Sequence, residues 1–209
     1  MARYTESVCK LCRRENLKLF LKGEKCLTEK CPEEKRPYAP GEHGRRRRGK
    51  ESQYALQLRE KQKAKRLYGV LEKQFRGYYQ EASRRKGITG ENLLQLLEAR
   101  LDNIIYRLGY GASRAASRQL IRHGHVLVNN RKVNIPSFLV KENDVVAINP
   151  KSSASQAIKV FVKSPNRAEV PSWIRADDKN LKSTIIHIPE REEIQVPLQE
   201  QLIVELYSK

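Results

Sequence analysis

Long apolar stretches are absent from this sequence of 209 residues. Its mean hydropathy is −0.70, and no apolar run approaches the roughly 20 residues that a membrane-spanning helix needs. The amino-terminal residues also lack the apolar stretch of a secretory signal and the Arg- and Ser-rich pattern of a transit peptide. We therefore expect a cytoplasmic protein that does not bind a membrane.

Catalytic motifs are also missing. The chain has no Gly-rich phosphate loop, no set of metal ligands with an open position and no paired acids in an apolar context. These are the common sequence signatures of a catalytic site. We expect the protein not to be an enzyme and to have no small-molecule substrate.

Acidic residues are scarce beside basic ones, because 24 Asp and Glu stand against 42 Lys and Arg, for a formal net charge of +18. Such an excess repels itself in the free protein and therefore favours a polyanionic partner. The excess is uneven: residues 1–50 contain 15 basic and 7 acidic residues, whereas residues 151–209 contain 9 and 8. The anion-binding surface should lie mostly before residue 150.

Four cysteines lie within 23 residues, in the pattern C-x2-C, thirteen residues, then C-x4-C. They are Cys9, Cys12, Cys26 and Cys31. Two such pairs can form a tetrahedral thiolate cage, which favours zinc and leaves no open position for catalysis. An iron–sulfur cluster also takes four cysteines, and free thiols or disulfides are further alternatives. We expect a structural metal site, with thiol pKa values lowered by basic neighbours such as Lys10 and Arg13.

A loop rich in proline and glycine follows at residues 36–50. Its block of like charge comprises Arg45, Arg46, Arg47 and Arg48. Such a block is often a disordered tail, but this one lies between two segments that we expect to be ordered. We therefore predict a loop that contacts phosphates and becomes ordered on binding.

The spacing of apolar residues predicts helices from Ser52 to Gly69, from Leu71 to Lys86 and from Thr89 through Leu101. In the last part of the chain, we expect strands at residues 184–188 and 201–207.

Ser113 and Gly124 delimit a further short helix, the first as its cap and the second as its stop. Its expected apolar side consists of Ala115, Ala116 and Leu120. Arginines repeat at four-residue spacing on the opposite side: Arg114, Arg118 and Arg122. Since like charges repel and no acid separates them, this strip favours an anionic partner over a merely solvated face.

After Gly124 the apolar period changes to two, which predicts a β-hairpin. Asn129-Asn130 suits a two-residue turn, because Asn tolerates positive φ better than most residues. Arg131 and Lys132 follow the turn, and a further strand is expected near residues 145–148. Together these elements predict a small α+β module that is basic on one side.

Residues 113–135, SRAASRQLIRHGHVLVNNRKVNI, resemble the RNA-binding module first recognised in ribosomal protein four of the small subunit. The same module occurs in pseudouridine synthases and tyrosyl-tRNA synthetases. The cysteine spacing, the segment Arg36-Pro37-Tyr38 and the loop at residues 40–44 resemble the amino-terminal end of the bacterial ribosomal protein four family in its four-cysteine form. The segments HIPEREE and ELYSK are similar to its ending, so the resemblance covers nearly the whole chain.

The resemblance implies an α+β fold. A helical amino-terminal domain would carry the four-cysteine metal knuckle, and a small RNA-binding module would consist of two helices and a β-hairpin or small sheet. We expect residues 1–44 to form the metal-binding segment and loop, and residues 100–163 to form the inserted RNA-binding module. Residues 45–99 would form a basic helical domain that residues 165–209 complete.

The resemblance further implies a structural constituent of the small ribosomal subunit. Such proteins bind 16S rRNA at a junction of helices in its 5′ domain and nucleate assembly of the 30S body. They meet ribosomal protein five at a surface that affects translational accuracy, lie beside other small-subunit proteins and sit near the channel through which mRNA enters. The residues expected to bind RNA are Arg45, Arg46, Arg47, Arg48, Arg59, Lys63, Arg66, Arg114, Arg118, Arg122, His123, His125, Arg131 and Lys132.

Two rival functions are weighed against this one. An RNA-modifying enzyme can carry the same module, but it would need a catalytic domain for which too little chain remains. A DNA-binding regulator with a cysteine cage would use the arginine strip as a recognition helix, yet the chain offers no dimerisation heptads. Relative affinity for folded ribosomal RNA and for duplex DNA separates the last rival from the ribosomal function.

Overall fold

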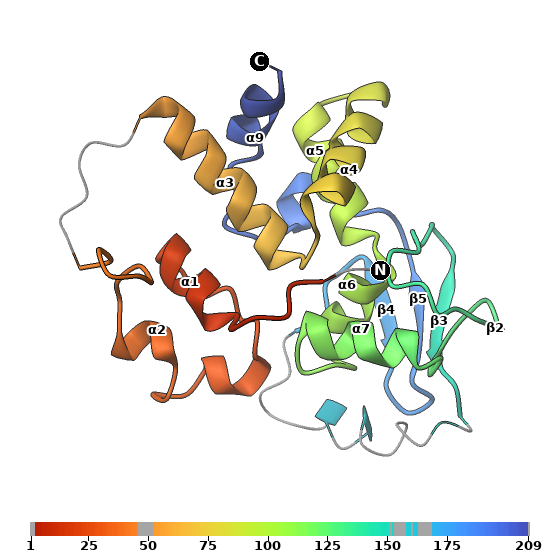
Figure 1. Cartoon of the computed structure of the whole chain (residues 1–209). Coiled ribbons are helices and arrows are strands. Elements are labelled where there is room, and N and C mark those ends of the chain that lie inside the picture. The colour runs from red at the N-terminus through yellow and green to blue at the C-terminus, as the bar shows by residue number, and fades with distance from the viewer. Residues whose placement is uncertain are drawn as a thin grey trace. The chain divides into compact units, whose positions relative to one another are not determined.

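The computed structural model describes residues 3–45, 52–150, 152, 158–159, 161–162 and 169–208. The chain forms two compact units (Figure 1): Met1–Leu93 with Val196–Lys209, and Leu94–Gln195. The second unit begins earlier and ends later than the module expected at 100–163. Two further strands, at residues 174–177 and 182–185, join its sheet and account for the later end. Within the described ranges, every helix is too short or too polar to cross a membrane.

The first unit is helical. In chain order its elements are α1 (Cys9–Glu15), the 3-10 helix η1 (Gly23–Cys26), α2 (Pro32–Lys35), α3 (Gln53–Leu67), α4 (Glu72–Arg84), the beginning of α5 (Thr89–Glu98) and α9 (Glu200–Tyr207). Helix α3 begins as predicted, because Ser52 Oγ accepts a hydrogen bond from the Ala55 backbone N–H. Gly69, with a φ of +64°, then turns the chain towards α4.

The carboxy-terminal segment is helical, so the strand predicted at residues 201–207 is wrong. Helix α9 packs along α3 (Figure 1), where Gln57 Nε2 donates to Glu205 Oε2 at 2.8 Å. The buried Glu60 carboxylate accepts from the Gln199 backbone N–H at 2.8 Å, and so supplies an acceptor at the start of α9. These contacts with a distant helix decide the conformation of the segment, and local periodicity does not reveal them.

Glu72, the first residue of α4, binds both α3 and α9. Lys61 Nζ lies 2.8 Å from Oε1, Lys65 Nζ lies 3.1 Å from Oε2, and the Tyr207 hydroxyl donates to Oε1 at 2.8 Å. Burial opposes ionisation of the Glu72 carboxyl, but the three hydrogen bonds outweigh it and lower the pKa to about 2. The ionised carboxylate therefore holds three helices of this unit together.

The second unit combines helices with an antiparallel sheet (Figure 1), which confirms the expected α+β fold. The remainder of α5 leads into α6 (Leu101–Arg107) and α7 (Arg114–Arg122). The strands are β1 (Val126–Val128), β2 (Arg131–Lys132), β3 (Val145–Ile148), β4 (Ile174–Asp177) and β5 (Lys182–Ile185), in the order β2-β1-β3-β5-β4. Buried apolar residues from both helices and the sheet form one core, which includes Ile105, Ile121, Val146 and Trp173.

The helix expected across residues 89–101 is interrupted at Arg100, whose backbone is extended, with φ −68° and ψ 135°. Arg100 instead forms a β-bridge with Leu139. The Leu101 backbone N–H donates to the Phe138 carbonyl at 2.8 Å. Pairing with this later segment replaces helical hydrogen bonds and separates α5 from α6, so the prediction of one continuous helix is wrong.

The hairpin between β1 and β2 is as predicted. Val128 and Arg131 pair across the turn. Asn129 and Asn130 have φ values of 48° and 63°, which is typical of a two-residue turn of type I′. Asn129 Oδ1 also accepts from the Val145 backbone N–H at 2.9 Å, so the turn is tied to β3. The local turn signal in the sequence was therefore sufficient to locate the hairpin.

We predict that Glu72→Gln destabilises the protein at neutral pH more than Glu81→Gln does, because Glu81 forms an exposed ion pair with Arg85 at the end of α4, and exposed pairs contribute little. The native pKa of Glu72 lies below its ordinary value of 4.5, so its ionised form contributes stability above about pH 4.5. That contribution is lost as the pH falls towards 2. Urea unfolding across this interval measures the difference between wild type and Glu72→Gln. A difference that does not shrink towards low pH would contradict the prediction.

Candidate nucleic-acid interface

Helix α7 is capped as predicted but buries a different side. Ser113 Oγ accepts from the Ala116 backbone N–H at 3.3 Å. Ala115 is exposed, so its place on the predicted apolar side is wrong, whereas Ala116 is half-buried and Leu120 is half-buried against the core as expected. The buried residues of α7 are Ser117, Arg118 and Ile121.

Close packing of the preceding loop explains this orientation of α7. A Cβ atom on Gly111 would lie 2.4 Å from Ser117 Oγ, so the loop backbone reaches the helix only because both residues are small. The small serine therefore faces inward, and Arg118, the next residue of the helix, is also buried.

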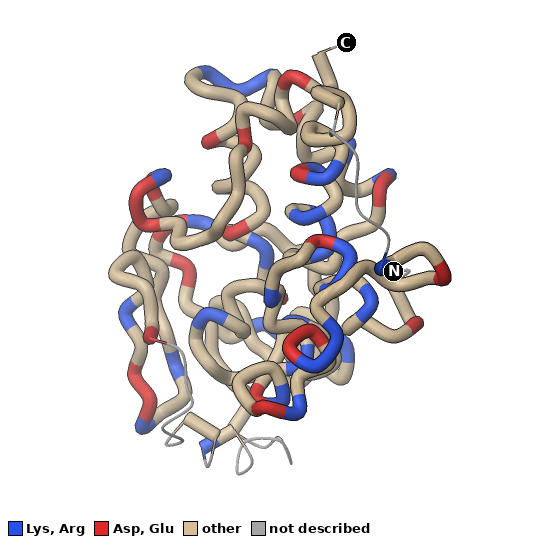
Figure 2. The backbone as a smooth tube through the Cα atoms, turned by 90° about the vertical axis from the view of Figure 1, so that its left-hand side faces the viewer, with Lys and Arg blue, Asp and Glu red and all other residues tan. Residues whose placement is uncertain are grey.

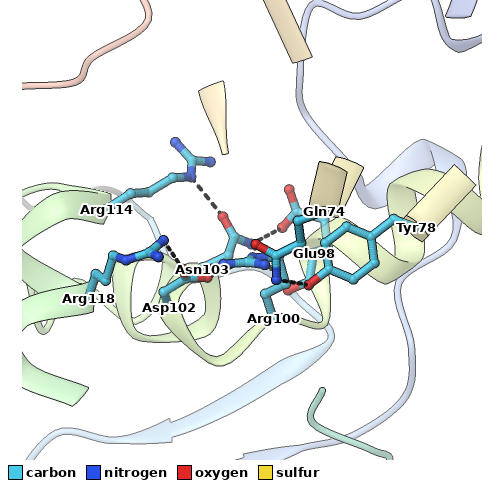
Figure 3. Close-up of polar contacts among 8 residues, drawn as sticks. All are labelled: Gln74, Tyr78, Glu98, Arg100, Asp102, Asn103, Arg114 and Arg118. Carbon is cyan, nitrogen blue, oxygen red and sulfur yellow. Dashed lines mark hydrogen bonds and ion pairs between the residues drawn. The ribbon is translucent and has the colours of Figure 1, made fainter. Parts of the chain in front are cut away.

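Arg118 takes part in a buried ion cluster with Arg100 and Asp102 (Figure 3). Arg100 is fully buried and donates to both carboxylate oxygens of Asp102, at 2.9 Å from Nε and 2.5 Å from Nη2. Arg118 Nη1 lies 3.6 Å from Asp102 Oδ2, and only 8% of its side chain is exposed. The middle arginine of the strip is thus engaged inside the protein.

Arg114 is held by a second polar cluster (Figure 3). Its Nε donates to Asn103 Oδ1 at 2.9 Å, and its guanidinium carbon lies 4.3 Å from the centre of the Tyr106 ring. Asn103 Nδ2 in turn donates to the buried Glu98 carboxylate at 2.7 Å, and Arg107 binds both oxygens of that carboxylate. This chain of contacts fixes the start of α7 against α5 and α6.

Exposed and half-buried basic residues of this unit gather where α7 meets the hairpin. We call this group, which comprises Arg122, His123, His125, Arg131 and Lys132, the α7–hairpin patch. Gly124 has a φ of +73°, and a Cβ there would lie 1.9 Å from Lys132 Cε, so the lysine side chain crosses the helix end at this glycine. The ring centres of His123 and His125 are 6.0 Å apart. The structure therefore brings Lys132 of β2 to the end of α7 beside His123 and His125, and Arg122 and Arg131 are the exposed neighbours of these residues along the chain.

Three predicted RNA-binding residues of α3 form ion pairs within the first unit. Arg59 Nη1 lies 3.4 Å from Glu15 Oε1, and Arg66 pairs with the same oxygen. Burial raises the pKa of Glu15, and the two guanidinium groups oppose that shift. Lys63 Nζ lies 2.6 Å from Glu60 Oε2. Their contacts with RNA stay a prediction, and part of their charge is already balanced by these carboxylates.

Two arginines, Arg13 and Arg45, contact the ring of Tyr38, and Arg13 is not among the residues predicted to bind RNA. The guanidinium carbons of Arg13 and Arg45 lie 4.8 and 4.9 Å from the centre of its ring. Arg13 Nε also donates to the Tyr38 carbonyl at 3.0 Å, and Arg45 donates to its hydroxyl at 3.3 Å. The arginines predicted at 46–48 lie outside the described residues. The tyrosine within the Arg36-Pro37-Tyr38 segment was the signal that could have located this cluster.

The four cysteines are unpaired thiols, and Cys12, Cys26 and Cys31 are buried. Burial raises the pKa of Cys12 and of Cys26, so the lowering expected from basic neighbours is wrong for these two thiols. The other three sulfurs lie near enough to Cys12 to raise its pKa further by charge repulsion. In the described ranges, no three His, Cys, Asp or Glu side chains are arranged as they would be around a metal ion.

Acidic positions are interspersed among basic ones along the described chain (Figure 2). Residues 3–98 match the ribosomal protein S4/S9 N-terminal domain, and residues 99–146 match the S4 domain. The two matches together define the class, a ribosomal protein that carries an S4 domain.

Similar proteins extend over the whole chain. Small ribosomal subunit protein uS4 of Clostridium tetani is 59% identical, uS4A of Clostridium botulinum 58% and uS4 of Natranaerobius thermophilus 54%, in each case over 100% of both chains. The chain belongs to the uS4 family of small ribosomal subunit proteins. Membership confirms the resemblance inferred from the sequence, and it confirms that the protein is not an enzyme.

We predict that Arg118→Ala lowers the free energy of unfolding by about 3 kcal/mol, because it leaves part of the charge of buried Asp102 without its partner. Arg122→Ala removes the same side chain from an exposed position one turn further along α7, and it should cost less than about 0.5 kcal/mol. Urea unfolding at neutral pH measures both values. Equal effects of the two substitutions would show that Arg118 has no special role in folding.

Proposed function

We propose that the protein is a structural constituent of the small ribosomal subunit that binds 16S rRNA directly. The α7–hairpin patch carries this proposal, because it presents three exposed cations and two histidines on the S4 domain. Cations of this kind neutralise phosphates and release counterions, and RNA helices are recognised largely through shape, phosphates and 2′-hydroxyls. This role places the protein on the ribosome in the cytoplasm.

We infer that its RNA target is the 5′ domain of 16S rRNA and that binding nucleates assembly of the 30S body. Contacts with ribosomal protein five and other small-subunit proteins, an influence on translational accuracy and a position near the incoming mRNA complete this proposal. Its support is the likeness to proteins named uS4 along the whole chain, together with basic surfaces in both units.

We predict that the full-length protein binds a 5′-domain transcript more tightly than duplex DNA of the same length, with an affinity that falls steeply as KCl is raised. Arg122→Glu should make the negative slope of log affinity against log salt shallower by about 1, because one phosphate contact is lost. Arg175→Glu is the matched control, since it makes the same change of charge at an exposed position on β4.

Equal slopes for the two variants would exclude a specific contact at the α7–hairpin patch. Equal affinity of the wild type for the transcript and for duplex DNA would favour the DNA-binding alternative.

We further propose that the four cysteines hold one structural metal, either zinc or an iron–sulfur cluster. The donor set suits such a group in chemical kind, because four thiols lie near one another in one unit and three of them are buried. Their side chains would have to close around the metal, since no three of them surround a common point in the described residues. Backbone N–H groups also point at sulfur: Lys22 donates to Cys26 Sγ at 3.4 Å, and Leu19 donates to Cys12. Such donors stabilise thiolate, which is the form that binds metal. A bound metal would cross-link η1 to α1 and has no role in catalysis.

We predict one metal equivalent per chain in freshly purified protein. Zinc would give no visible absorption, whereas an iron–sulfur cluster would. Cys26→Ser should lose the metal and lower the melting temperature, because a closed four-cysteine site contributes directly to folding. Elemental analysis that finds neither zinc nor iron in the wild type would refute the proposal, while RNA binding by the same sample would leave the ribosomal function intact.

A further inference from the structure

A pocket of about 390 Å³ opens beside α7 in the second unit. From α7 it is lined by Ala116, Gln119, Leu120 and His123, whose spacing of three and four residues places them on one helix face. Phe161 adds an aromatic ring, and most of the lining is apolar. The volume lies within the range of pockets that bind small organic groups.

The pocket carries two side chains that can hydrogen-bond to a ligand, one of them held in place. Gln119 is exposed, and within the described part of the chain its carboxamide makes no hydrogen bond. His125 Nδ1 lies 2.7 Å from Ser152 Oγ, which holds the second imidazole of the lining in place. A carboxamide presents a donor beside an acceptor, and this pair matches the polar edge of a nucleobase.

Basic residues lie next to the histidine side of the pocket. Its two histidines flank Gly124, the residue over which the Lys132 side chain passes, and Arg122 directly precedes His123. An apolar side chain of a partner protein would use the lining but would not need these cations. A nucleotide uses both, because its base is flat and weakly polar and its phosphates are anionic.

We propose that this pocket binds a single unstacked base of the RNA, while the adjoining phosphates contact Arg122 and Lys132. The inference rests on the proposed binding of rRNA and deepens it from charge recognition to recognition of one base. The base stacks against the aromatic rings of the lining and bonds through its edge to Gln119. The site thus combines sequence-independent affinity with a contact that depends on the base.

The test fills the pocket without changing any charge. Ala116→Leu occupies the pocket, whereas Ala115→Leu places the same side chain on the exposed neighbouring position of the same helix. We expect Ala116→Leu to weaken binding of the full-length protein to the 5′-domain transcript about tenfold, since one base loses its stacking contact. The salt slope should stay as in the wild type, because the phosphate contacts remain. Ala115→Leu should stay within about twofold of the wild type.

Chemical probing identifies the occupant. Base-specific reagents applied to the transcript should show one base that is protected in the wild-type complex and reactive again in the Ala116→Leu complex. Gln119→Ala, a substitution at an exposed position, is a second variant that should restore the reactivity of the same base. Melting curves confirm that all variants are folded.

The outcomes separate this inference from the function on which it rests. If the wild type does not bind the transcript, the proposed rRNA binding fails and the pocket proposal fails with it. If the wild type binds and Ala116→Leu behaves like Ala115→Leu, the pocket proposal alone is overturned. Weaker RNA binding by Ala116→Leu without a change in the reactivity of any base would also overturn it. So would normal RNA binding by Ala116→Leu combined with failure of a neighbouring small-subunit protein to bind the complex.

Discussion

Burial of the Asp102 carboxylate is the constraint on which the second unit depends. An ionised carboxylate removed from water costs several kcal/mol unless cationic groups compensate for it. Arg100 and Arg118 compensate for it here, one from the interruption between α5 and α6 and one from α7. Because Arg118 belongs to α7, whereas Asp102 and its cap residue Arg100 belong to α6, this cluster ties α7 to the start of α6. The α7–hairpin patch and the pocket include residues of α7, so their positions depend on this contact.

Arginines at equal spacing on one helix have unequal roles in this protein. Arg118 faces inward to Asp102, Arg114 lies over Tyr106 and binds Asn103, and Arg122 is exposed. On α3, arginines likewise pair with the buried Glu15. Some of the 42 Lys and Arg residues are therefore already held by internal partners and would have to give these up to bind phosphate. A count of basic residues indicates the class of partner but overstates the contact surface.

Each unit has its own basic surface, built in a different way. In the first unit, an aromatic ring at Tyr38 gathers two guanidinium groups beside the cysteine-bearing segment. In the second, a glycine at the end of α7 lets the Lys132 side chain cross it, and an apolar pocket adjoins the cations. Phosphate contacts of the first kind would supply affinity, whereas a pocket that accepts a base would fix the position of the protein along a folded RNA.

Features that depend on a few neighbouring residues could be predicted from the sequence. The caps at Ser52 and Ser113 and the turn at Asn129-Asn130 are local hydrogen-bond and φ preferences, and the family is evident from motifs along the chain. Tertiary structure alone decided the interruption at Arg100, the inward side of α7 and the helical state of α9. Each of these depends on a partner far along the chain or on a close backbone approach, and the free energy of such contacts exceeds the small differences in local propensity.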